Sequence, residues 1–223
     1  MMDPHVALPT LEVGIPAGGA RLAGDLAVPH GARGIVLFAH GSGSSRKSSR
    51  NVEVAQTLQQ VGLATLLFDL LTPDEERVDL HTRQYRFDIP RLASRLVAAS
   101  EWLRSNDNVR DLPIGYFGAS TGSAAAIIAA AELGTRVSAV VSRGGRPDLA
   151  DDATLARVTA PTLLIVGGHD DLVIGLNQQA FRHLTCEKEL VIVPGATHLF
   201  EEPGTLAEVA RLAAAWFDRH VER

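Results

Sequence analysis

The chain has 223 residues, of which 46% are hydrophobic, so it can bury one large core as a single domain over residues 1–223. A net charge of −5 argues against partners such as nucleic acid or an anionic membrane surface, and the lone Cys186 excludes an internal disulfide. No apolar run approaches the ~20 residues that span a bilayer, and residues 1–5 lack the features of a signal peptide, which predicts a cytoplasmic protein.

In chain order, the first predicted element is an antiparallel hairpin, Leu11–Ile15 and Ala20–Val28, around a Pro-Ala-Gly-Gly turn. Beyond it, apolar strands alternate with amphipathic helices. Strands are predicted at Ile35–Phe38, Ala64–Phe68, Ile114–Phe117, Val137–Val141, Leu163–Val166 and Leu190–Val193. Helices are predicted at Asn51–Val61, Ile89–Arg104, Ser123–Leu133, Leu172–Leu184 and Thr205–His220. This alternation predicts an α/β fold with a mostly parallel, twisted sheet of about eight strands and helices on both faces.

A glycine-rich segment, His40-Gly41-Ser42-Gly43, follows the first strand after the hairpin. An ordinary turn before a helix and a phosphate-binding loop are both alternatives for such a segment. Neither G-x-x-x-x-G-K-[ST] nor G-x-G-x-x-G fits the residues, so the sequence gives little support to nucleotide binding.

Ser120 lies in Gly118-Ala119-Ser120-Thr121-Gly122, between an apolar strand and an alanine-rich helix. A serine on a tight turn between strand and helix is typical of a nucleophile elbow. The flanking glycines allow the sharp turn, and the helix dipole favours negative charge on a nearby substrate oxygen. A flexible turn that matches by chance is the alternative. The context favours a nucleophile and predicts an acid and a base further along the chain.

The acid is predicted in the segment Gly167–Val173, directly after a buried strand. Carboxylates at this position lie on the edge where open α/β sheets place their sites, and Asp170 and Asp171 are both candidates. The base is predicted at His198, in the loop after the last strand. His169 neighbours the acid, but choosing it would leave no base after that strand.

The order Ser120, aspartate, His198 is the order found in α/β-hydrolases. A serine hydroxyl is a poor nucleophile until a base accepts its proton, and imidazole side chains titrate near neutrality. An aspartate fixes the imidazole tautomer and stabilises the transient imidazolium.

On these motifs almost the whole chain resembles a compact α/β-hydrolase, and within that superfamily it is most similar to the dienelactone hydrolase-like group. The spacing Gly167, Asp170, Val173 matches the G-x-x-D-x-x-V pattern usual in the family and favours Asp170 as the acid, with Asp171 capping the following helix. One position departs from the family, because dienelactone hydrolases proper use a cysteine nucleophile where this chain has Ser120. The departure puts a dienelactone substrate in doubt but not acyl-type hydrolysis.

The resemblance also implies an oxyanion hole. In similar hydrolases, one backbone N–H comes from the loop that corresponds to residues 40–43 and another from the residue after the nucleophile. In this chain these would be the amides of Ser42 and Thr121.

Many α/β-hydrolases carry a lid after the strand that follows the elbow helix. Here residues 142–160 leave room for a loop and one short helix, so no cap domain is expected, and the less regular stretch 71–88 is the only other candidate cover. An open, shallow site disfavours long-chain lipid substrates.

Two loops expected at the catalytic edge are basic, and they contain Arg46, Lys47, Arg50, Arg143 and Arg146. Guanidinium pairs suit carboxylate or phosphate, so these residues could bind an anionic group of the substrate. Alternatively, they are solvated or pair internally with Asp69, Asp148 or Asp151.

The sequence therefore predicts a serine hydrolase of small esters, lactones or thioesters that forms an acyl-enzyme on Ser120, with a small-molecule substrate and with no cofactor or metal. A preference for anionic substrates depends on the basic loops. The alternatives are a short-peptide hydrolase and a non-catalytic ligand-binding or regulatory module on a hydrolase scaffold. The oligomeric state stays open.

Overall fold

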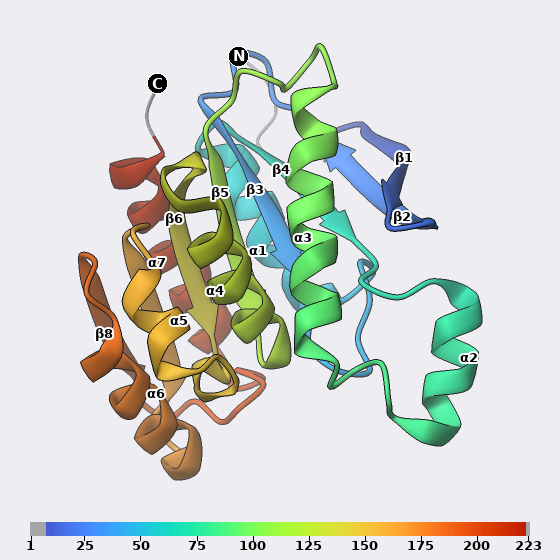
Figure 1. Cartoon of the computed structure of the whole chain (residues 1–223). Helices are drawn as coiled ribbons and strands as arrows, with labels where there is room; N and C mark the ends of the chain where they lie inside the picture. Colours follow the sequence, from blue (N-terminus) through green and yellow to red (C-terminus); the bar gives the residue numbers. More distant parts are fainter. Residues whose placement is uncertain (1–7, 222–223) are drawn as a thin grey trace.

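The computed structural model describes residues 8–221 (Figure 1). The segment 1–5, on which the expectation about a signal peptide depends, lies outside the described residues. Within residues 8–221, no helix is both long enough and apolar enough to cross a bilayer.

Eight strands form one sheet in the order β1-β2-β4-β3-β5-β6-β7-β8. The pairs β1–β2 and β2–β4 are antiparallel and the remaining pairs are parallel, so the prediction of a mostly parallel sheet of about eight strands is confirmed. The strands are β1 Thr10–Ala17, β2 Ala20–Ala27, β3 Gly34–Ala39, β4 Leu63–Phe68, β5 Ile114–Ala119, β6 Val137–Arg143, β7 Thr162–Gly167 and β8 Lys188–Val193.

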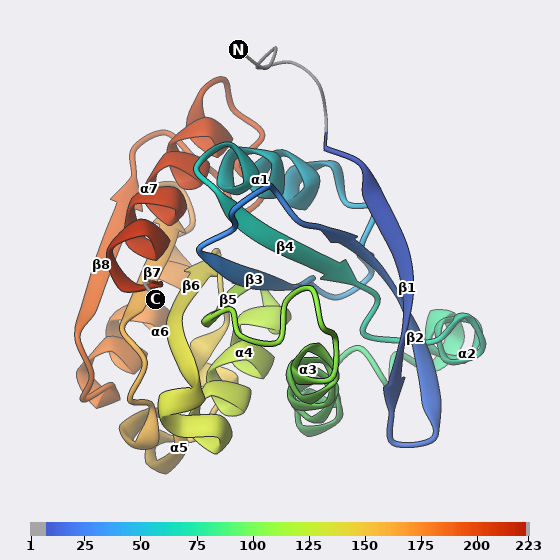
Figure 2. The same ribbon diagram turned by 90° about the horizontal axis from the view of Figure 1, so that it is seen from above.

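Helices cover both faces of the sheet, as Figure 2 shows. One face carries α1 and α7, and the other carries α3, α4, α5 and α6. The helices are α1 Ser49–Gln60, α2 Pro73–Thr82, α3 Ile89–Arg104, α4 Thr121–Leu133, α5 Asp152–Arg157, α6 Asp171–His183 and α7 Thr205–His220, with short 3-10 turns at Gly134–Arg136 and Pro147–Leu149.

The central strands are continuous apolar runs because helices cover them on both sides. Every residue of β3, β4, β5 and β7 is buried. Helix α4 is rich in alanine, and its small side chains bring it close to the sheet beside the end of β5. The parallel strands place their carboxyl ends, and the loops that follow them, at one edge of the sheet.

Helix α2 is the main element that the sequence analysis did not predict. It lies in the stretch 71–88 and stands apart from the sheet, at the lower right of Figure 1. Only Asp79 is buried in α2, so the helix has no apolar stripe that hydrophobic periodicity could detect. The stretch 142–160 contains the one short helix that was expected, α5, and no separate cap domain.

Candidate active site

Ser120 occupies a strained turn between β5 and α4. Its φ of 51° and ψ of −121° lie outside the regions that non-glycine residues normally adopt. The flanking glycines are sterically required, because a Cβ on Gly118 would lie 2.5 Å from the Cα atom of Ser123, and a Cβ on Gly122 would lie 2.2 Å from the carbonyl oxygen of Ala39. The turn has the geometry of a nucleophile elbow.

The loop after β6 holds the turn in place. The backbone N–H of Ser120 donates to the carbonyl oxygen of Arg143 at 3.2 Å, and the N–H of Arg146 donates to the carbonyl oxygen of Ser120 at 3.1 Å. These two bonds explain how a strained residue is kept in one conformation.

Asp170 and His198 form a hydrogen-bonded pair. The Nδ1 atom of His198 lies 2.7 Å from Oδ2 of Asp170; the aspartate side chain is 15% exposed and the histidine side chain 39% exposed. Because a carboxylate only accepts hydrogen bonds, Nδ1 is the protonated nitrogen and Nε2 is left to accept a proton. This is the tautomer that a general base needs.

The two aspartates differ from the expected arrangement in one respect. Asp170, not Asp171, occupies the N-cap position of α6, and Asp171 is the first residue of the helix. The Asp170 side chain makes no capping bond to α6, because it is turned toward His198. The carboxylate of Asp171 is placed where the helix dipole favours negative charge.

Gly144 connects the serine turn to the histidine loop. A Cβ on Gly144 would lie 3.0 Å from the carbonyl oxygen of His198 and 3.6 Å from its Cε1 atom, so the imidazole packs against this residue. Gly144 directly follows Arg143, the residue to which the Ser120 amide is bonded. Ser120 and His198 therefore contact adjacent residues at the end of β6, although they follow different strands.

The glycine-rich loop after β3 packs against the serine turn. A Cβ on Gly41 would lie 3.1 Å from the Cβ of Ser120. The N–H of Ser42 donates to Oγ1 of Thr121 at 3.0 Å, and the two side-chain oxygens are 2.9 Å apart. The two residues expected to supply oxyanion amides are thus in contact, and the Ser42 amide is already bonded to the Thr121 hydroxyl.

His40 holds this loop in place through two hydrogen bonds to the backbone, a role that the sequence analysis did not assign. The N–H of Leu70 donates to Nε2 of His40 at 3.0 Å, so Nδ1 carries the proton and donates to the carbonyl oxygen of Gly41 at 3.0 Å. Burial lowers the pKa of His40, against the opposing effects of the Gly41 carbonyl and Asp69, so the ring is neutral. The sequence signal for this supporting role was a histidine at the end of a strand, directly before the segment Gly41-Ser42-Gly43.

Most of the basic residues near the site are paired with carboxylates. Arg46 bonds to Asp69 and lies 3.2 Å from Asp25, Lys47 lies 2.7 Å from Asp25, Arg50 lies 3.0 Å from Glu201, and Arg146 bonds twice to Asp148. For Arg46 and Arg146, these are the internal partners expected under the alternative interpretation.

Arg143 is different because its side chain is buried. The residue is 7% exposed, its guanidinium lies 6.0 Å from the centre of the Phe117 ring, and its Nη1 atom has no hydrogen-bond partner within residues 8–221. Burial, with a smaller effect of the nearby Arg50 charge, lowers the pKa of Arg143 to about 10. The five cations therefore do not form one open cluster at the catalytic edge.

Comparison with known proteins identifies the family. The sequence model of one protein family, described as the alpha/beta hydrolase domain, matches residues 32–211 of this chain. The crystal structure of a dienelactone hydrolase from Anabaena variabilis is 58% identical, with a TM-score of 0.94 over 96% of this chain and 99% of that chain. The esterase Est1E from Butyrivibrio proteoclasticus shares the fold at 18% identity, with a TM-score of 0.78 over 93% of this chain and 98% of that one.

A Mycobacterium tuberculosis protein with the provisional name phosphoribosyl transferase is 58% identical over 94% of this chain. The match covers 46% of that protein, so the chain spans about half the length of this curated relative. The family model and the dienelactone hydrolase structure that is 58% identical agree with the fold described above. The chain belongs to the alpha/beta hydrolase family and resembles its dienelactone hydrolases.

Proposed function

We propose that this protein is a serine hydrolase that cleaves small ester, lactone or thioester bonds through an acyl-enzyme on Ser120. The observation that carries the proposal is the 2.7 Å bond between His198 and Asp170, beside a serine held in an elbow. Such a pair leaves Nε2 of His198 as the proton acceptor at the same sheet edge as Ser120, which is the only serine with a positive φ within residues 8–221.

In the proposed mechanism, the Oγ of Ser120 attacks the carbonyl carbon while Nε2 of His198 accepts its proton. The tetrahedral oxygen receives hydrogen bonds from the amides of Thr121 and Ser42. When the tetrahedral intermediate collapses, the imidazolium donates its proton to the leaving group, and Asp170 stabilises that charge throughout. Water, activated by the same histidine, then attacks the acyl-enzyme and releases the acid.

Uncharged substrates fit the site better than anionic ones. Arg46, Lys47, Arg50 and Arg146 hold carboxylates, and Arg143 is buried on the sheet. A carboxylate partner offsets the charge of each of these four cations and so reduces its attraction for a second anion. The proposed substrate is therefore uncharged.

The name of the mycobacterial relative gives no second candidate. Phosphoribosyl transfer belongs to the description of a protein about twice as long. The elbow and the aspartate–histidine pair of this chain are suited to acyl transfer.

The proposal is tested by initial rates on 4-nitrophenyl butanoate, a butanoyl thioester and a short peptide amide, with Ser120→Ala as the matched variant. Hydrolysis of the ester and thioester is expected, and Ser120→Ala should lower kcat by on the order of 10³-fold or more. A variant as active as the wild type would contradict an acyl-enzyme on Ser120. Cleavage of the peptide amide alone would favour the peptidase alternative.

A further inference from the structure

A cavity of about 350 Å³ lies beside the loop that packs against Ser120. This volume is at the small end of the range for ligand pockets. Its walls include Gly41, Ser42, Leu70, Leu71, Leu80 and Leu92. A Cβ on Gly41 would lie 3.1 Å from the Cβ of Ser120, so this residue of the cavity wall packs against the proposed nucleophile, although Ser120 itself does not line the cavity.

The position of the cavity in the sheet determines which half of a substrate could enter it. Ser120 follows β5, and the cavity lies on the side of β3 and β4, whereas His198 follows β8 on the opposite side. His198 must donate its proton to the leaving group, so the leaving group lies on the side of β6, β7 and β8. The acyl group is then directed toward β3 and β4, where the cavity opens.

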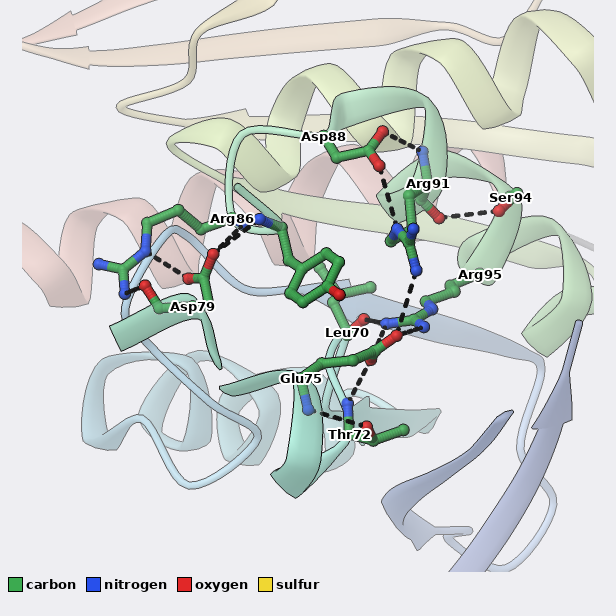
Figure 3. A network of polar contacts seen from close by, with 10 residues as sticks. Leu70, Thr72, Glu75, Asp79, Arg86, Asp88, Arg91, Ser94 and Arg95 are labelled. Atoms are coloured by element: carbon green, nitrogen blue, oxygen red, sulfur yellow. Dashed lines mark hydrogen bonds and ion pairs between the residues drawn. The ribbon is translucent and has the colours of Figure 1, made fainter. Parts of the chain in front are cut away.

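Helix α2 forms the outer wall of the cavity through Leu80. The start of the helix is fixed by a capping box, in which the N–H of Glu75 bonds to the Thr72 side chain and the Glu75 carboxylate bonds to the Thr72 N–H. The same carboxylate accepts two bonds from Arg95 of α3, at 2.7 and 2.5 Å (Figure 3). Arg95 also donates to the carbonyl oxygen of Leu70, which ties α2 to the end of β4.

The end of α2 is fixed by a second set of bonds. The Asp79 carboxylate accepts from the backbone N–H groups of Tyr85 and Arg86, at 2.7 and 3.0 Å, and from Nε of Arg86 at 2.5 Å (Figure 3). Hydrogen bonds at both ends of α2 favour a wall that is in place before a ligand binds.

The lining combines four leucines with the hydroxyl groups of Ser42, Ser44, Ser45 and Ser48, and it suits an uncharged group. Leu70, Leu71 and Leu92 are buried leucines, and Leu80 adds an apolar side chain from the outside. Charged groups at the cavity are neutralised in pairs, Asp79 by Arg86 and Lys47 by Asp25. Glu76 adds a carboxylate at the cavity, which opposes an acyl group that ends in a negative charge.

We propose that this cavity is the acyl pocket and that it selects uncharged acyl groups larger than acetyl, with α2 limiting their length. The proposal rests on the proposed function. It assigns to Leu80, a residue outside the catalytic machinery, the role of determining acyl-chain specificity.

The kinetic test compares 4-nitrophenyl acetate, butanoate, hexanoate and dodecanoate. The wild type should prefer butanoate or hexanoate to acetate and should discriminate against dodecanoate. Leu80→Trp fills the cavity from a side chain that is 71% exposed, so the fold should tolerate it. It should lower kcat/KM for hexanoate by about tenfold and leave that for acetate within about twofold.

Leu11→Trp is the matched control, because Leu11 is 59% exposed and lies on β1, away from the cavity. It should leave the chain-length profile unchanged. An equal effect of Leu80→Trp on acetate and hexanoate, or the same change in Leu11→Trp, would overturn the assignment.

A binding measurement separates this proposal from the proposed function. Hexanamide carries the acyl group without a reactive ester, and methyl NMR should show shifts at Leu71 and Leu92 that are lost in Leu80→Trp. Such shifts in a protein without esterase activity would support the pocket but refute the proposed hydrolase function. Esterase activity with leucine methyls that do not respond to hexanamide would refute the pocket alone.

Discussion

The backbone N–H of Ser42 donates a hydrogen bond to the Oγ1 atom of Thr121 at 3.0 Å, across 79 positions of sequence. The bond joins the loop after β3 to the first residue of α4. It holds one proposed oxyanion donor at a fixed distance from the residue that supplies the other. When a tetrahedral oxygen forms, the Ser42 amide has to divide its hydrogen bond between Thr121 Oγ1 and that oxygen, or to exchange one for the other. The negatively charged oxygen is the stronger acceptor of the two.

Replacing Thr121 by valine should therefore impair catalysis more than substrate binding. Valine keeps the size of threonine and its branching but removes the acceptor that orients the Ser42 amide. We expect kcat on 4-nitrophenyl butanoate to fall by about tenfold with little change in KM, since a misdirected donor costs less than a deleted one. Thr121→Ser retains the hydroxyl and should stay within about twofold of the wild type. Similar losses in both variants would show that the hydroxyl does not orient the amide.

Exchanging each aspartate for asparagine should distinguish Asp170 from Asp171. Asp170→Asn removes the carboxylate bonded to His198 and favours the wrong imidazole tautomer, so kcat should fall by on the order of 10³- to 10⁴-fold. Asp171→Asn changes the first residue of α6 and should alter kcat by less than about threefold. Rates measured at one pH on the same ester decide between them. The larger loss in Asp171→Asn would reverse the assignment.

The bonds that fix α2 predict a dependence of stability on pH. Burial acts to raise the pKa of Glu75, but hydrogen bonds from Arg95 and Thr72 outweigh it and lower the pKa to about 2, from an ordinary value of 4.5. A carboxylate whose pKa is lower in the folded state stabilises the fold fully above its unfolded pKa. This contribution is lost as the pH falls from about 4.5 toward 2.

Glu75→Gln should therefore lower the free energy of unfolding at pH 7 by about 1–2 kcal/mol, once solvent screening is counted. The difference between variant and wild type should shrink as the pH falls, because a protonated glutamate resembles glutamine. Urea unfolding at several pH values measures it. Glu208→Gln, at an exposed pair with Arg211, is the matched control and should change stability by less than about 0.5 kcal/mol. A difference independent of pH would contradict the account.

The strands and most helices could be predicted because the pattern of apolar residues along the sequence reflects which side chains are buried. Runs such as 35–38 and 163–166 are apolar throughout since helices cover both faces of the sheet. Helix α2 could not be found in this way, because its Glu75 is held by Arg95 of α3, which in turn donates to the carbonyl oxygen of Leu70. Thr72 and Glu75, three residues apart with Pro73 between them, were the local signal that a helix starts there.

The part of the candidate site that depends on residues at strand ends could be predicted from the sequence. The positions of Ser120, Asp170 and His198 after three different strands indicated their meeting at one edge, while their catalytic roles stay predictions. Pairing of the basic loops could not be foreseen in full, because Asp25 comes from the antiparallel hairpin and Glu201 from the loop before α7. The contact between Ser42 and Thr121 depends on side-chain geometry that no spacing encodes.

The most direct test of the central claim is reaction of the folded protein with a fluorophosphonate probe, followed by mass spectrometry to locate the adduct. One adduct is expected on Ser120, with slower labelling in His198→Ala and none in Ser120→Ala. Folded wild-type protein that stays unlabelled, or that carries its adduct on another residue, would contradict an activated serine at this elbow.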